Sequence, residues 1–161
     1  MPETAVARVV VLGVGNELMK DEGVGVAVVR RLSRRGHDRR IAPLEAGTAL
    51  LDALDLVPPG AAVLVVDAAS AGGEPGSVYR LRLDDVGTGR GVSLHETSLP
   101  EAFAAARLGG ARFGPVVVLG IEPADVAVGT ELSERLEKKL PAILDTVCDE
   151  ARRLLDAPRG V

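Results

Sequence analysis

The stretch VARVVVLG, at residues 6–13, decides the fold class of this chain. Apart from Arg8 it is a continuous apolar run, rich in β-branched side chains, that ends at a glycine. Such a run is typical of a strand buried on both faces of a sheet. Residues 61–66 (AAVLVV) and 115–121 (PVVVLGI) have the same character. Residues 41–45 favour a short strand, and residues 77–83 (SVYRLRL) alternate as a half-exposed strand does.

Helical patterns separate these expected strands. They predict helices from about Glu22 to Arg35 and over residues 48–57, 98–108 and 131–155. Strands that alternate with helices predict an α/β fold with a mostly parallel sheet. A chain of 161 residues without an internal repeat or a linker has the size of one domain, so we expect a single domain over residues 1–161.

The composition argues against several functional classes. The formal net charge of −4 disfavours binding to a phosphate backbone, and the aromatic content of 2% provides no surface for stacking bases. The apolar runs are far too short for a membrane span, and the N-terminus lacks the pattern of a secretory signal. The single cysteine, Cys148, cannot form an internal disulfide. We therefore expect a cytoplasmic protein with neither a nucleic-acid nor a membrane partner.

Three polar side chains fall where a functional site is expected. In a parallel sheet, sites form outside the carboxyl ends of the strands. Glu22 comes after the first expected strand, Asp67 stands at the end of the strand that begins at residue 61, and His95 lies in an expected loop at 93–99. Two carboxylates and an imidazole suit divalent nickel, zinc, manganese or iron. Each residue also has a structural alternative: a helix-dipole contact for Glu22, internal pairing for Asp67 and a loop hydrogen bond for His95.

A dinucleotide site is the alternative from another functional class. Gly13 and Gly15 match the start of the G-x-G-x-x-G fingerprint, but Leu18 stands at the third glycine. Asp21 and Glu22 also place negative charge where a pyrophosphate would need the helix N-terminus. Because the match is only partial, a nucleotide-binding α/β module is kept as the alternative interpretation and not as the main one. Ser70 as a nucleophile has no supporting motif, since no G-x-S-x-G elbow is present.

A series of short motifs extends over nearly the whole chain: VLGVGN (11–16) with DEGVG (21–25), GT (47–48) followed by LL (50–51), VDA (66–68), PG (75–76), SLH (93–95) with Leu99, and GIEP (120–123). In this order and spacing the motifs resemble those of the hydrogenase maturation proteases. These endopeptidases trim the C-terminus of the large subunit of [NiFe] hydrogenases. The resemblance implies a three-layer α/β/α sandwich with a twisted, mostly parallel sheet.

The resemblance also implies a site. Position by position, the metal-binding residues of the family correspond to Glu22, Asp67 and His95, the trio already selected by its place in the sheet. The metal is nickel carried by the substrate, and zinc or cadmium would be able to take its place. Asp67 is the candidate catalytic residue. The attacking water is polarised either by the metal or by a carboxylate as in an aspartic-type peptidase, and both routes stay open.

The expected partner is the nickel-loaded precursor of a hydrogenase large subunit, which a monomeric enzyme would process. Gly47 and Thr48 are the residues expected to contact this substrate. The family often has two glycines before the threonine, whereas this chain has Ala46 at the first of these positions. A third interpretation is a chaperone that checks metal loading and does not cleave.

Overall fold

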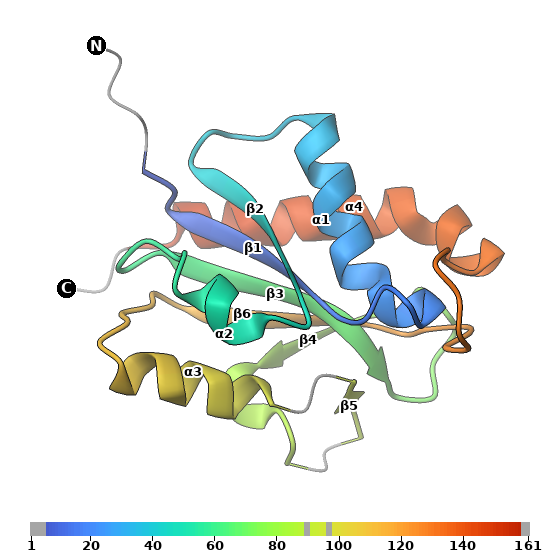
Figure 1. Ribbon diagram of the computed structural model, residues 1–161. Helices are drawn as coiled ribbons and strands as arrows, with labels where there is room; N and C mark the ends of the chain where they lie inside the picture. Colours follow the sequence, from blue (N-terminus) through green and yellow to red (C-terminus); the bar gives the residue numbers. More distant parts are fainter. Residues whose placement is uncertain (1–5, 89–90, 96–97, 159–161) are drawn as a thin grey trace.

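The computed structural model describes residues 6–88, 91–95 and 98–158. These residues form a six-stranded sheet in the order β2-β1-β3-β6-β4, with β5 paired to β3 beside this path (Figure 1). β2, β1, β3 and β6 run parallel to one another, whereas β4 runs antiparallel to β6 and β5 antiparallel to β3. The strands are β1 (Val9–Val14), β2 (Ile41–Gly47), β3 (Ala62–Ser70), β4 (Val78–Arg82), β5 (Ser93–Leu94) and β6 (Val116–Ile121).

Helices cover both faces of the sheet. α1 (Val24–Arg35) and α4 (Glu134–Asp156) pack on one face, and α2 (Leu50–Leu54) and α3 (Leu99–Leu108) pack on the other (Figure 1). The described residues also form two short 3-10 turns, η1 (Lys20–Gly23) and η2 (Leu83–Asp85). Successive side chains of β3 point to opposite faces of the sheet, so that Val66 packs with α1 and α4 whereas Val65 packs with α2 and α3. The predicted α/β/α sandwich is confirmed.

The sequence-based boundaries are wrong at the carboxyl edge of the sheet. The strand expected to finish at Asp67 continues to Ser70, so that Asp67 lies inside β3. The segment expected to be a loop at 93–99 begins with β5. The physical reason is a change of partner: β6 pairs with β3 as far as Ala68, and β5 then pairs with Ala69 and Ser70.

Two predicted helices are shorter than expected. Glu22 lies in the η1 turn, and the α-helix begins only at Val24. On the other side, α2 covers Leu50–Leu54 rather than residues 48–57. Gly47 reverses the chain there with a φ of 55°, and Ala49 closes a tight turn before the helix can start.

α4 is the longest helix in the described ranges, with 23 residues. Across the ranges 6–88, 91–95 and 98–158, none of the helices combines the length and the apolar character needed to cross a bilayer.

Candidate active site

Glu22 and His95 meet at the carboxyl edge of the sheet, although 73 positions separate them in the sequence. Oε1 of Glu22 lies 3.0 Å from Nδ1 of His95. The exposed fractions of the two side chains are 26% and 22%, respectively. The pair is therefore shielded on most sides but open to a partner that approaches this edge.

The short strand β5 determines where His95 lies. Its pairing with β3 continues into His95, whose backbone N–H donates to the carbonyl of Ala68 at 3.0 Å. On the imidazole, Nε2 lies 3.0 Å from Oγ of Ser70. Both ring nitrogens thus have partners. Because the carboxylate of Glu22 only accepts, the neutral ring carries its proton on Nδ1 and presents the Nε2 lone pair to the Ser70 hydroxyl.

Ser70 is the residue of this arrangement that sequence reasoning set aside. Its separation of 25 residues from His95 follows no known spacing. The contact depends on β3 continuing past Asp67 and on β5 pairing beside it, and neither feature has a local sequence signal. Only the tertiary structure brings the hydroxyl to the ring.

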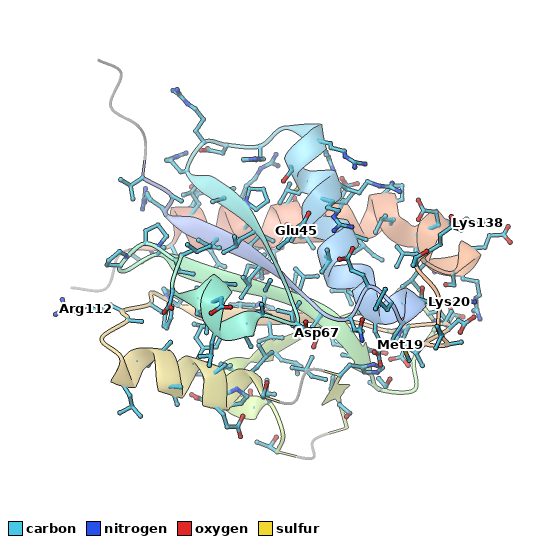
Figure 2. All side chains as sticks on the ribbon, in the orientation of Figure 1. Met19, Lys20, Glu45, Asp67, Arg112 and Lys138 are labelled. Carbon is cyan, nitrogen blue, oxygen red and sulfur yellow. The ribbon has the colours of Figure 1, made fainter. Side chains whose placement is uncertain are left out.

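Asp67 is fully buried in β3 beside Gly120 of β6. Its Oδ1 accepts a hydrogen bond from the backbone N–H of Ala68 at 2.8 Å. Strand alternation puts its side chain on the face shared with Val65 and Ala69, which is the face covered by α2 and α3. Figure 2 shows Asp67 at the same end of the sheet as the labelled Met19 and Lys20, which belong to the segment between β1 and α1, residues 15–23, here called the first loop.

Gly15 lies between the backbone of Glu22 and the carboxylate of Asp67. Its φ is 133°, and a Cβ added to it would lie 1.9 Å from the carbonyl oxygen of Glu22 and 3.6 Å from Oδ1 of Asp67. Only a glycine fits between the η1 backbone and the Asp67 carboxylate. The glycine at this turn is therefore explained by close packing within the chain, between Gly15, the backbone of Glu22 and Asp67, and not by contact with a pyrophosphate.

The predicted trio does not form a ready-made metal centre. Within the described ranges, no group of three or more His, Cys, Asp and Glu side chains is arranged to hold a metal ion. Glu22 and His95 are instead hydrogen-bonded to each other. An ion that used both residues as ligands would have to replace this contact.

The two predicted substrate residues lie beside the first loop. The carbonyl of Gly47 accepts a hydrogen bond of 3.0 Å from the N–H of Gly15, which ties the end of β2 to the turn that leads to Glu22. Thr48 is exposed and lines a groove between α2 and α3.

Asp21, the neighbour of Glu22, has a different role from the one its sequence position suggests. It is fully buried and accepts four hydrogen bonds. The donors are the backbone N–H groups of Ala124 and Asp125, both at 2.9 Å, and the N–H and hydroxyl of Ser133, both at 2.7 Å. Ser133 is also the N-cap of α4. Asp21 thereby joins the first loop to the segment between β6 and α4.

Lys20 adds a second connection to that segment. Its Nζ lies 2.8 Å from Oδ2 of Asp125. The hydrogen bond and the opposite charges raise the pKa of Lys20 and lower the pKa of Asp125. Backbone bonds of 2.9 Å join Lys20 to Gly129 and Gly129 to Leu18. The loop that carries Glu22 is therefore fixed on the side that faces α4, whereas Glu22 itself contacts His95.

Comparison with known proteins identifies the family. The family model described as hydrogenase maturation protease matches residues 26–150, a segment that includes Asp67 and His95. The chain belongs to the hydrogenase maturation protease family. The resemblance inferred from the motifs is confirmed, and membership favours the protease interpretation over a nucleotide-binding module.

Individual members of the family agree with this assignment. The hydrogenase expression/formation protein HupD of Rhodobacter capsulatus is 34% identical over 130 residues, which cover 78% of this chain and 62% of that protein. HupD of Bradyrhizobium diazoefficiens is 32% identical over 146 residues, which cover 88% and 76%. The hydrogenase maturating endopeptidase HybD from Escherichia coli superposes with a TM-score of 0.76 and 27% identity over 91% of this chain and 93% of that one.

Proposed function

We propose that this protein is an endopeptidase that removes a C-terminal extension from the nickel-loaded large-subunit precursor of a [NiFe] hydrogenase. Family membership supports the reaction class. The observation that supports the site is the contact between Glu22 and His95, which are distant in sequence, at the edge of the sheet where β3 carries the buried Asp67. Titratable side chains gathered in this way at the carboxyl ends of parallel strands are a recurrent arrangement of active sites.

The substrate's own nickel is the recognition element in this proposal. His95 offers its Nε2 lone pair once the Ser70 hydroxyl turns away, and Glu22 offers a carboxylate oxygen beside it. Asp67 completes the set of nitrogen and oxygen donors that suits divalent nickel, and also zinc or cadmium. Exchange of existing hydrogen bonds for metal contacts would align the precursor, and such alignment lowers the entropic barrier to the chemical step.

The chemical step is hydrolysis of one peptide bond. A water oxygen adds to the scissile carbonyl carbon, the C–N bond breaks, and the water's protons pass to the new amine and carboxyl groups. Asp67 is the residue that we place at the attacking water, as base or as ligand of the metal that polarises it. The aspartic-type and metal-assisted routes differ only in which group activates this water.

Gly47 and Thr48 would guide the substrate polypeptide toward that water. Their position next to Gly15, within one hydrogen bond of the loop that leads to Glu22, supports this role. We also propose that the enzyme works as a monomer in the cytoplasm, without nucleic-acid or membrane partners. The single cysteine in the sequence fits a reducing compartment.

Two substitutions test the site. His95→Ala and Asp67→Asn should abolish release of the C-terminal extension from nickel-loaded precursor, measured by mass spectrometry, while circular dichroism shows an intact fold. His37→Ala is the matched control, because His37 is the other histidine of the chain and is exposed, with its ring bonded to the adjacent carbonyl of Asp38. Near-normal cleavage by both site variants would refute the proposal, and so would wild-type protein that binds loaded precursor without cutting it.

A further inference from the structure

A groove lies on the α2/α3 face beside the candidate active site. Its volume is about 440 Å³, within the range of sites that bind small ligands. One wall begins at Thr48, directly after the Gly47 turn that is bonded to Gly15. The other wall begins at Ser98, three residues after His95. The two segments that frame the candidate site therefore continue into the groove, which we call the α2–α3 groove.

Most of the side chains that line this groove are apolar. Leu50 and Ala102 are buried at its base, and Leu51 is 51% exposed along its side. Ala102 and Ala105, which are one turn apart on α3, keep the groove open because alanine fills so little of the space between the two helices. An apolar stem of about the width of a hydrocarbon chain would find contacts on both sides.

Two carboxylates border this apolar surface, Asp52 on α2 and Glu101 on α3. Both are exposed, and in the ranges that the structure describes neither is paired with a basic side chain. What distinguishes Asp52 and Glu101 from the other exposed acids is their place on the two helices that form the groove. Net negative charge over an apolar groove is complementary to a lysine or arginine side chain, which combines a hydrocarbon stem with a cationic end.

We propose that the α2–α3 groove binds the part of the precursor polypeptide next to the scissile bond, and that it takes a basic side chain between Asp52 and Glu101. This assignment rests on the proposed function, because it gives the groove to the same substrate. The position of Asp67 supports it, since that side chain lies on the face of the sheet that α2 and α3 cover. A polypeptide bound beside His95 would reach the groove at Ser98 on one side and at Thr48 on the other.

The experiment measures kcat and KM for the nickel-loaded precursor at several salt concentrations. Asp52→Asn combined with Glu101→Gln should raise KM about three- to tenfold with little change in kcat, since each exposed charge contributes modestly. The increase of KM with salt should be weaker in this variant than in wild type, because the screened attraction is gone. Ala105→Trp should also raise KM by filling the groove.

Matched controls come from the same helices. Asp55→Asn removes an exposed carboxylate at the C-cap of α2, three residues after Asp52, and Ala104→Trp adds the same bulk to an exposed neighbour of Ala105; neither residue lines this groove. In the precursor, replacing lysines and arginines near the cleavage point one at a time by glutamate should identify one position that raises KM. Asp52→Lys with Glu101→Lys should restore cleavage of that substrate.

Groove variants whose KM stays within twofold of both controls would overturn the inference while wild type still cleaves. A wild-type protein that releases no extension would instead overturn the proposed function, so the two failures are distinguishable.

Discussion

Asp21 and Glu22 are adjacent in sequence, yet their carboxylates occupy opposite kinds of surroundings. Asp21 is fully buried and accepts four hydrogen bonds from the segment before α4. Glu22 is partly exposed and contacts the ring of His95, which also has Ser70 as a partner. A buried carboxylate with many donors fixes the backbone, whereas a carboxylate with few, exchangeable contacts is able to change partners. The contacts of Asp21, the fixed side of the loop, hold the backbone in place. Glu22 with its partners His95 and Ser70, the open side, thereby keeps its geometry.

The largest expected effect is on the free energy of unfolding, which should fall much more when Asp21 is replaced than when Glu22 is replaced. Asp21→Ala should lower the free energy of unfolding by roughly 3–5 kcal/mol, because it leaves several buried donors without an acceptor. Glu22→Ala should cost about 1 kcal/mol or less, as expected for a partly exposed pair, while it abolishes processing. Urea denaturation gives the first quantity and the precursor assay gives the second. Equal losses of stability in the two variants would contradict the conclusion that Asp21, and not Glu22, fixes the backbone of the loop.

A smaller effect is expected from Ser70, on the open side. Ser70→Ala removes one hydrogen bond to Nε2 of His95, worth roughly 1 kcal/mol, so kcat/KM for the precursor should fall about two- to tenfold. Ser70→Thr keeps the hydroxyl and should retain most of the activity. Ser93→Ala, at an exposed position of β5, is the control.

The size of this loss distinguishes two roles. A modest decrease fits a residue that positions the imidazole. Complete loss in Ser70→Ala, with an intact fold, would instead make Ser70 part of the chemistry and contradict the positioning role. Activity equal to that of Ser93→Ala would remove Ser70 from the site.

The smallest expected effect concerns Tyr79 of β4, whose partner Glu122 lies two residues before the segment that Asp21 binds. Burial raises the pKa of Tyr79, and so does its hydrogen bond of 2.9 Å to the buried Glu122 at the end of β6. Tyr79 is the only tyrosine and there is no tryptophan, so absorbance at alkaline pH should report this one group, with a midpoint above the usual value of about 10. Glu122→Gln should lower the midpoint but leave the part due to burial.

The same shift has a consequence for stability. The folded protein binds the Tyr79 proton more tightly than the unfolded chain does. The resulting stabilisation is fully present below pH of about 10 and is lost as the pH rises through the folded pKa. Urea denaturation at a series of alkaline pH values measures it. A Tyr79 midpoint at or below the usual value would contradict the described contact with Glu122.

Local patterns were sufficient to predict most of the fold. Continuous β-branched runs predicted β1, β3 and β6, and helical periodicity predicted α1, α3 and α4 within a few residues. These patterns are local because burial on one or both faces imposes a period of its own on each element. The boundaries failed at Asp67 and at β5, where the length of a strand depends on which partner lies beside it.

The sequence by itself determined the fold class, the family and the candidates Glu22, Asp67 and His95, because all of these follow from periodicity, motif order and position relative to the strands. Only the tertiary structure decided that Asp21 is buried and holds the first loop in place, whereas Glu22 is partly exposed. It also decided that Ser70 contacts His95 and that α2 and α3 form a groove. These features join segments up to 112 positions apart. Such contacts depend on how whole elements pack, and no pattern within one element encodes them.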